Sequence, residues 1–325
     1  MTYEERALGC MIGSAYGDSL GAAVEFMSSN EINKQYGDKG ITELVPVYGR
    51  AGNITDDTQM AIATAEGIIN TLDEQRHDKE VVTRNIWQEY KKWYDTQSDF
   101  EQMRAPGNTC LSALGSGKMG TIEHPLNGSA GCGAIMRAHP IGIVYADRAM
   151  AYELGVTSGA ITHGHPNGYV PSGFLSVLTS ELMEGKDFDQ ALGYVGKEVQ
   201  RLPEGKGLGT FNAVRKAVFA GKVTDTFSAI DKEVGGGGGW QGHDALGIGV
   251  FAVLQAADDP LEAVRISVNH GGDTDSTGAI TGALVGAMHG PDAFLDTLDR
   301  QGVELEHVEY LGELAAKLAA IRNYR

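Results

Sequence analysis

Two short stretches of the sequence concentrate oxygen-bearing side chains. Thr55-Asp56-Asp57 and Asp273-Thr274-Asp275-Ser276 together supply four carboxylates with interleaved hydroxyls, and little Lys or Arg lies beside them. Hard divalent cations such as Mg²⁺ and Mn²⁺ prefer ligand sets of this kind. The pattern therefore predicts that the two stretches bind divalent metal ions and that the chemistry is metal-assisted.

Both acidic stretches are expected at helix N-termini. Each precedes a run of small or apolar residues, 60–63 in the first case and 278–280 in the second. Asp and Thr are preferred N-cap residues, so capping alone would explain any one of these side chains. A helix needs one cap, and each further acid in its first turn gains only about 0.3–1 kcal/mol. Four carboxylates therefore exceed what capping explains.

An EF-hand loop is the first alternative for the second stretch. A loop that begins at Asp273 would place Gly278 correctly at its sixth position, but its twelfth residue would be Leu284. An EF-hand requires a bidentate glutamate there. This alternative is rejected.

A phosphatase of the haloacid-dehalogenase type is the second alternative. Asp273, Asp275 and Thr277 match its Asp-x-Asp-x-Thr signature literally. That signature is followed by a whole α/β domain, whereas only 48 residues, 278–325, follow Thr277 here. The supporting acids Asp56 and Asp57 also precede the signature, so this alternative is the less favoured one.

The elements that position these residues are expected to be helices. Apolar residues recur at helical spacing in most of the chain, and only 41–47 is typical of a strand or an extended connection. Glycines cluster before several helical segments, where free N–H groups bind anions. Because the two acidic stretches must meet, we expect one all-α domain over 1–325 despite the glycine run at 235–239. The predicted helices are Met60–Leu72, Val81–Tyr94, Ala149–Ile161, Phe174–Met183, Leu246–Ala256 and Leu305–Ile321.

The composition limits the classes of partner that the protein is expected to bind. Asp and Glu number 43 against 26 Lys and Arg, which gives a net charge of -17. This charge repels nucleic acid and anionic membranes. No apolar run approaches the roughly 20 residues that span a bilayer, and the three cysteines form no Cys-x-x-Cys pair. A cytoplasmic protein without a membrane partner is expected, and the charge disfavours nucleic acid as a ligand.

Ordered motifs along the chain resemble the ADP-ribosylglycohydrolase family. The resemblance extends from about residue 6 to residue 290. The motifs that carry it are Gly9-Cys10-Met11-Ile12-Gly13, the segment 17–26, Ile54-Thr55-Asp56-Asp57-Thr58, Gly107-Asn108-Thr109-Cys110, the segment 131–137, Ile161-Thr162-His163 and the segment 271–276.

The resemblance implies a fold and a reaction. The fold would be a compact orthogonal multi-helix bundle, and the enzyme would cleave the glycosidic bond between ADP-ribose and a modified acceptor. ADP-ribosyl-arginine on protein is the first choice of substrate, ahead of serine-linked, nucleic-acid-linked and small ADP-ribosyl compounds, and ADP-ribose would be the product. Two divalent cations, Mg²⁺ or Mn²⁺, would be held by Thr55, Asp56, Asp57, Asp273, Asp275 and Ser276.

The resemblance also assigns roles to other residues. The catalytic residues would be Asp56, Asp57, Glu25 and Asp273, and the choice of proton acceptor among Asp56, Asp57 and Glu25 stays open. Asp18 would be either a helix-packing acid or a support for the ligands. The substrate-binding residues would be Gly107, Asn108, Thr109, Ser129, Gly131, Cys132, Gly133, His163 and Trp240.

Several of these positions have other interpretations. His163 could instead cap a helix end, and a single tryptophan such as Trp240 is often a core residue. Cys132 stands where members of the family usually have asparagine, and Ala105 stands where the dinitrogenase-reductase type has aspartate. The acceptor therefore stays open. An ADP-ribose-binding or toxin-neutralising (immunity) protein that acts mainly by binding its partner is the alternative of a different class.

Overall fold

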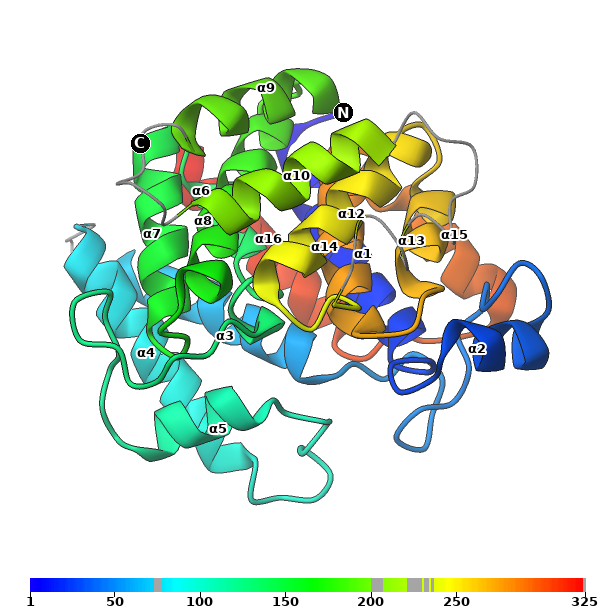
Figure 1. The fold of residues 1–325 in the computed structure, drawn as a ribbon, viewed down its shortest axis with the longest axis horizontal. Coiled ribbons are helices and arrows are strands. Elements are labelled where there is room, and N and C mark those ends of the chain that lie inside the picture. Colours follow the sequence, from blue (N-terminus) through cyan, green and yellow to red (C-terminus); the bar gives the residue numbers. More distant parts are fainter. Residues whose placement is uncertain (73–77, 200–206, 221–229, 231–233, 235–236, 324–325) are drawn as a thin grey trace.

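The computed structural model describes residues 1–325 except 73–77, 200–206, 221–229, 231–233, 235–236 and 324–325. The described residues form helices and connecting loops without a β-strand, which confirms the all-α prediction (Figure 1). The elements are α1 (Tyr3–Gly21), α2 (Ser29–Tyr36), α3 (Asp56–Ile69), η1 (Asn70–Leu72), α4 (Lys79–Thr96), α5 (Asn108–Gly115), η2 (Cys132–Ala134), α6 (His139–Val144), α7 (Arg148–Ala160), α8 (Pro166–Met183), α9 (Phe188–Val199), α10 (Leu208–Ala220), α12 (Gly242–Gln255), α13 (Pro260–Val268), α14 (Thr274–His289), α15 (Asp292–Gln301) and α16 (Val308–Asn323).

The predicted helices coincide with observed ones, with differences at the ends. The largest difference is in α8, which begins at Pro166 rather than at Phe174. His165 caps this helix by accepting a hydrogen bond from the Asn167 N–H, and Pro166 suits the first position because it lacks an N–H to satisfy. Pro171 inside the helix hid this start, because proline normally disfavours a helix interior.

Two further expectations concern loops. Segment 41–47 is an extended connection rather than a strand, and Val47 pairs only with Arg50 in an isolated bridge. Gly131 directly precedes the short 3₁₀ turn η2 rather than an α-helix. Of the run at 235–239, residues 235–236 lie outside the described residues.

Helices α1 and α14 form the centre of the molecule (Figure 1). They run antiparallel and touch through residues spaced one turn apart on both helices. A Cβ atom at Gly13 would lie 2.3 Å from the Gly282 carbonyl oxygen, and one at Gly17 would lie 2.0 Å from that of Gly278. Any side chain at these positions would force the helices apart. The facing pairs are Gly9 with Gly286, Gly13 with Gly282, Gly17 with Gly278 and Gly21 with Thr274.

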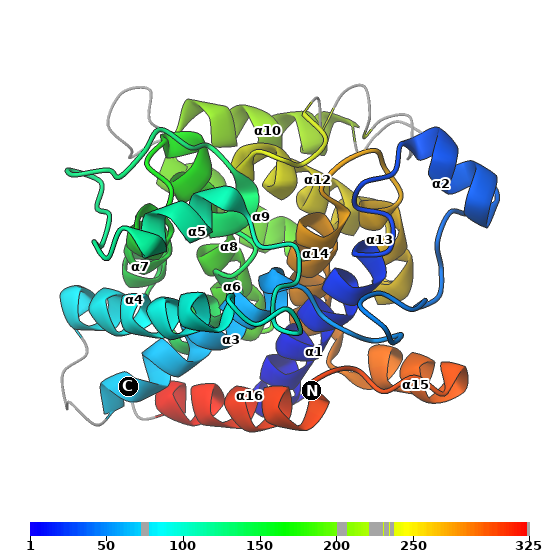
Figure 2. The same cartoon turned by 90° about the horizontal axis from the view of Figure 1, so that it is seen from below.

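This close pairing determines which helix ends meet. Because the pair is antiparallel, the C-terminal end of α1 lies at the N-terminal end of α14. Helix α16 packs against α1 and α3, and α4 lies along α3 (Figure 2). Buried apolar side chains from Ala7 to Ile321 form one core cluster. No described helix is both long and apolar enough to cross a membrane.

Candidate functional site

Asp18 on α1 fastens the start of α3. The carboxylate is fully buried and accepts hydrogen bonds from the backbone N–H and the hydroxyl of Thr55, with the hydroxyl oxygen 2.7 Å from Oδ1. It also accepts bonds from the N–H and the hydroxyl of Thr58. Four donors from one helix N-terminus therefore converge on one carboxylate. Of the two expectations for Asp18, support of the α3 acids describes these contacts better than helix packing.

The first acidic stretch occupies the cap and first turn of α3. Thr55 is the N-cap, and its hydroxyl oxygen accepts a bond from the Asp57 N–H at 3.2 Å. Asp56 Oδ2 accepts a weak bond from the Gly107 N–H at 3.4 Å, which brings the α5 loop to the acids. Oδ1 of Asp57 is buried and has no hydrogen-bond partner among the described residues. One carboxylate oxygen is thus left free inside the protein.

The second acidic stretch occupies the same place on α14. Asp273 is the N-cap and accepts a bond from the Ser276 N–H at 3.3 Å. Its own N–H donates to the Gly238 carbonyl oxygen at 2.8 Å, so the segment before α12 holds it from the other side. Asp275 Oδ1 also accepts from the Ser276 N–H, at 2.9 Å. Glu25, which follows α1, interacts with Asp275 through their side chains.

The acids of the site repel one another, and no basic side chain of the described residues forms an ion pair with them. In the described part of the chain, none of Asp18, Glu25, Asp56, Asp57, Asp273 and Asp275 forms an ion pair with Lys or Arg. Burial, followed by repulsion from Asp273 and Asp18, raises the pKa of Glu25 to about 8. Burial raises the pKa of Asp18 to about 6 against its hydrogen bonds with Thr58 and Thr55.

The pKa values of the four predicted catalytic and ligand aspartates rise for the same reason. Burial is the main cause at each, and it raises the pKa of Asp56, Asp57 and Asp275 well above the ordinary range. Repulsion adds to burial, from Asp18 on Asp56, from Asp56 on Asp57 and from Asp57 on Asp275. The pKa of Asp273 is also raised by burial. The two acidic stretches therefore lie close enough together to interact electrostatically, as the sequence predicted.

Glycine loops and a buried histidine form the wall beside the acids. The hydroxyls of Thr109 and Ser129 lie 3.0 Å apart, and Ser129 Oγ accepts a bond from the Gly131 N–H. A Cβ atom at Gly131 or Gly133 would lie within about 3.2 Å of the His163 ring. The segments that contain these residues are thus brought together, as expected.

The side chain of His163 bonds to the neighbouring Thr162 hydroxyl rather than capping the end of α7. Its backbone N–H donates to the Gly159 carbonyl oxygen after the end of α7, and its Nδ1 lies 2.9 Å from the Thr162 hydroxyl. The ring is buried, and burial together with the nearby Arg137 guanidinium lowers its pKa to about 3. The neighbouring His165 takes the capping role instead, at the start of α8.

Aromatic side chains lie at the edge of the site. Trp240 is 44% exposed, so the expectation that it could be a core residue was wrong. Its ring stacks on Phe26 with centroids 6.1 Å apart, and its carbonyl oxygen accepts a bond from the Cys132 N–H. Tyr48 lies close enough to Glu25 and the aspartates for their charges to raise its pKa, after burial as the first cause. No motif or spacing in the sequence pointed to Tyr48, which lies in a loop at φ 52°.

Asn108 differs from the other predicted binding residues. It is exposed at the first turn of α5 and lines a surface groove with Tyr94 and Asp95, on the side of α4. Gly107, immediately before it, is the α5 N-cap without a side-chain cap, which leaves N–H groups of this helix start free for a ligand.

The donor set fits divalent cations. Among the described residues, Oδ1 of Asp57 has no hydrogen-bond partner and no Lys or Arg pairs with these acids, and a bound cation would supply the missing partner. The Thr55 hydroxyl donates to Asp18 and accepts from the Asp57 N–H, so one of its lone pairs stays available. Among the described residues, no three His, Cys, Asp or Glu side chains already enclose one cation position. A bound cation would have to draw the carboxylates together.

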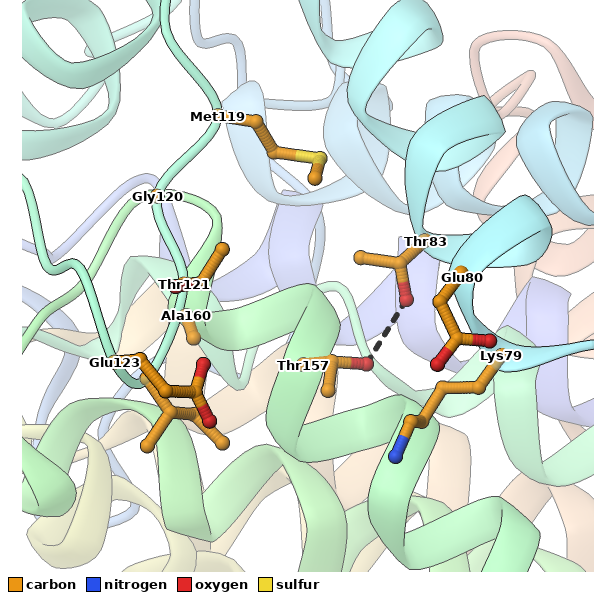
Figure 3. Close-up of a pocket in the computed structure, with 10 residues that line it drawn as sticks. Lys79, Glu80, Thr83, Met119, Gly120, Thr121, Glu123, Thr157 and Ala160 are labelled. Carbon is orange, nitrogen blue, oxygen red and sulfur yellow. Dashed lines mark hydrogen bonds between the residues drawn. The ribbon is translucent and has the colours of Figure 1, made fainter.

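A separate pocket of about 300 Å³ lies between α4, α7 and the loop at 119–123 (Figure 3). Its hydroxyls satisfy each other, with Thr83 Oγ1 2.9 Å from Thr157 Oγ1. No predicted site residue lines it, and its charges have both signs, from Lys79, Glu80 and Glu123. The acidic site is therefore the stronger candidate.

The described residues thus form an all-helical fold in which buried acids at two helix starts adjoin glycine-containing loops. The chain belongs to the ADP-ribosylglycohydrolase family, whose model matches residues 1–324. It is therefore a hydrolase of ADP-ribose linkages, and the resemblance seen in the sequence is confirmed.

Individual relatives agree with this membership. The chain is 29% identical to ADP-ribosyl-[dinitrogen reductase] glycohydrolase of Rhodospirillum rubrum, over 91% of this chain and 90% of that protein. It is 25% identical to ADP-ribosylarginine hydrolase Tri1 of Serratia proteamaculans, over 95% and 78% of the two chains. A solved structure of an ADP-ribosylglycohydrolase-related protein complex shares the fold with a TM-score of 0.70 at 23% identity, over 98% and 99% of the two chains.

Proposed function

We propose that this hydrolase removes ADP-ribose from arginine side chains of modified proteins with the help of two divalent cations, Mg²⁺ or Mn²⁺. The observation that carries the proposal is the group of six buried carboxylates that have no basic partner among the described residues. Four of them lie at the starts of α3 and α14, and Asp18 and Glu25 lie at and after the end of α1. Leaving several buried charges unpaired is costly unless a ligand of opposite charge binds.

Thr55, Asp56, Asp57, Asp273, Asp275 and Ser276 would hold the cations. When bound, divalent cations would orient the ribose hydroxyls and lower the pKa of an attacking water. Asp18 keeps the first three ligands in place, since it binds both Thr55 and the N-terminal turn of α3. In this proposal Asp18 positions the ligands and does not touch the substrate.

Glu25 is our choice for the group that accepts and returns the proton, with Asp56 and Asp57 as the other candidates. It follows α1 at the edge of the acid group, its side chain interacts with that of Asp275, and burial raises its pKa, so that it holds a proton more readily than an exposed carboxyl does. Asp273 and Asp57 would contribute the negative field that stabilises the positive charge on the ribose as its bond breaks.

The loops would bind the rest of ADP-ribose. Backbone N–H groups at Thr109 and Gly133 suit a diphosphate, because the start of α5 carries no side-chain cap and favours an anion. Gly107 and Gly131, whose N–H groups donate to Asp56 and Ser129, would let the loops approach the ligand closely. The Thr162 hydroxyl accepts from Arg137 and can donate to His163 Nδ1, which leaves a proton on Nε2 for a ligand oxygen. Ser129, Cys132, Asn108 and Trp240 complete the proposed binding set.

Arginine is favoured as the acceptor for two reasons. Relatives of this chain carry the names of an ADP-ribosylarginine hydrolase and of a dinitrogen reductase glycohydrolase. A net charge of -17 also attracts a cationic guanidinium group. The three free cysteines are consistent with a reducing cytosol as the proposed location.

One panel of substrates tests the proposal. The purified protein is incubated with arginine-, serine- and nucleic-acid-linked ADP-ribose, with Mg²⁺ or Mn²⁺ and with a chelator, and released ADP-ribose is measured. We expect release from the arginine conjugate that the chelator abolishes. Release from the serine or nucleic-acid conjugate alone would show that the acceptor is not arginine. Binding of ADP-ribose without release from any conjugate would favour the binding or immunity protein.

A further inference from the structure

Two sulfur atoms face the proposed cation ligands. Cys132 Sγ lies 2.5 Å from Asp273 Oδ2 and 3.7 Å from Ser276 Oγ. Met136 Sδ lies 3.8 Å from the same serine oxygen. The two sulfur-bearing residues are four positions apart, Cys132 at the start of η2 and Met136 just after it, so they approach Ser276 from one segment. A thiol and a thioether therefore border a site that is otherwise built of oxygen atoms.

The sulfur atoms adjoin an oxygen that needs a partner. The charge of Asp57 acts directly on the Cys132 thiol, and the Asp57 side chain interacts with that of Ser276. Oδ1 of Asp57, a residue that is 3% exposed, has no hydrogen-bond partner among the described residues. Asp57 on α3, Asp273 and Ser276 on α14 and Cys132 at η2 thus surround one small region.

The spacing suits donors that share a cation. Metal–sulfur and metal–oxygen bonds of about 2.3 and 2.0–2.2 Å place neighbouring donor atoms roughly 3–4 Å apart. The separation between Cys132 Sγ and Ser276 Oγ lies in this range, and a small rotation of Asp273 would bring its closer oxygen into the same range. Sulfur donors favour zinc and other soft or borderline cations, whereas Mg²⁺ prefers oxygen donors alone.

We propose that Cys132 contributes a thiolate ligand to one of the cation positions, with Met136 as an adjacent thioether, so that this position prefers Zn²⁺, Co²⁺ or Cd²⁺ to Mg²⁺. This rests on the proposed function in one respect, namely that the carboxylates bind divalent cations. The S–H bond of Cys132 breaks, a sulfur–metal bond forms, and the proton leaves to the solvent. No electron is transferred.

Metal spectroscopy tests this without measuring activity. Co²⁺ and Cd²⁺ are titrated into the cation-free protein, and thiolate-to-metal charge-transfer absorption in the ultraviolet is recorded for the wild type and for Cys132→Ser. Cys110→Ser is the matched control, because Cys110 is buried in the same wall but its sulfur lies 3.6 Å from Arg137 Nη1. Calorimetric titrations give the affinities for Cd²⁺, Zn²⁺, Mg²⁺ and Mn²⁺.

We expect a charge-transfer band in the wild type and in Cys110→Ser, and its loss in Cys132→Ser. Cys132→Ser should bind Cd²⁺ and Zn²⁺ about 10- to 100-fold more weakly, while its Mg²⁺ affinity changes by less than about twofold. Met136→Leu, which keeps a similar volume, should retain the band and bind Cd²⁺ a few-fold more weakly.

The results that would contradict the thiolate ligand can be told apart from those that would contradict the proposed function. Co²⁺ binding to the wild type without a charge-transfer band, or an unchanged band in Cys132→Ser, would overturn the thiolate ligand and leave the proposed hydrolase intact. Because the first of these results needs only the wild type, a failure of Cys132→Ser to fold does not remove the test. If the wild type bound none of the four cations, the thiolate proposal would fail together with the metal dependence of the proposed function.

Discussion

Buried acids occur in two regions of this protein, with opposite surroundings. Glu181 on α8 is 2% exposed and lies between two cations. Arg148 binds both of its carboxylate oxygens, at 2.6 and 3.1 Å, and Lys186 binds one of them. These partners hold the pKa of Glu181 below its usual value against the effect of burial. Asp57, which is 3% exposed, has no cationic partner in the described chain, and its pKa is raised.

The difference separates structural acids from acids that await a ligand. Around Glu181 the fold supplies the positive charge itself, so this acid can stabilise the native state. Around Asp57 the described residues gather further carboxylates and supply no cationic partner. The native state therefore bears a free-energy cost that a bound cation or protons must offset. The first arrangement serves stability, and the second is consistent with function at the expense of stability.

Asp57→Asn should have the largest effect, and it should act on activity. Removing one proposed cation ligand should lower kcat/KM for ADP-ribosyl-arginine by about 10²- to 10³-fold. The cation-free variant should be at least as stable as the wild type, because a buried unpaired charge is removed. Kinetics and thermal unfolding in chelator measure the two effects. A large loss of stability would show that Asp57 is a structural acid like Glu181.

Glu181→Gln should give the reverse outcome. Arg148 and Lys186 lose their shared carboxylate, but both are partly exposed, so we expect a loss of about 1–3 kcal/mol in the free energy of unfolding with nearly unchanged kcat. Glu153→Gln is the matched control, because its 2.8 Å ion pair with Lys79 is at the surface and should contribute less than about 1 kcal/mol. If urea unfolding showed equal losses of stability for both variants, the contrast between the buried Glu181 ion pairs and the unpaired acids would be contradicted.

Gly13→Ala tests whether the central helix pair brings the acids together. The added Cβ would lie 2.3 Å from the Gly282 carbonyl oxygen, so the helices must separate and unfolding should become easier by about 1–3 kcal/mol. Gly193→Ala in α9 is the control, because no atom lies within 4 Å of its added Cβ. It should stabilise by about 0.5–1 kcal/mol through helix propensity. Calorimetry on both variants checks the opposite signs.

The pH dependence of stability should show the unpaired acids as a gradual effect, without a mutation. The pKa of Glu25 is raised to about 8 in the folded protein, so between its unfolded value and pH 8 the folded state holds a proton that the unfolded state lacks. Stability of the cation-free protein should therefore fall as pH rises from 6.5 to 8.5, by up to about 1.4 kcal/mol per unit for one group. Thermal unfolding with saturating Mn²⁺ should lack this slope, because a bound cation replaces the proton.

The acids and the buried histidines affect stability in different pH ranges. Burial lowers the pKa of His139 and His163 to about 3 in the folded state. Below about pH 6.5 these histidines therefore bind protons in the unfolded state but not in the folded state. Their contribution to stability is thus lost as pH falls, which is the opposite sign. If the cation-free protein were instead more stable at pH 8.5 than at pH 6.5, the unpaired acids would not control the slope.

Much of the site was predictable because it depends on local chemistry. Thr55 and Asp273 are N-caps, as their residue types and the helical runs after them indicate. The order of motifs predicted the family and the all-α fold. The one-turn spacing of Gly9, Gly13, Gly17 and Gly21 was also visible, and it could have predicted a close helix contact on α1.

Other features required contacts between distant parts of the chain. The approach of Cys132 to Asp273 joins residues 141 positions apart, and that of Asp18 to Thr55 joins residues 37 positions apart. Neither pair has a local pattern. The exposed pair of Phe26 and Trp240 likewise depends on how the segment before α12 passes the end of α1. A single sequence carries no direct record of such distances.

The sequence by itself thus determined the helical character, the two acidic helix starts and the family. The tertiary structure decided which acids lack a partner and which have one. The physical reason is that helix formation and capping act between residues a few positions apart, whereas the pKa of a buried carboxylate depends on every charge and donor that packing brings within a few ångströms of it. For Glu181 packing brings Arg148, and for Asp57 it brings another aspartate.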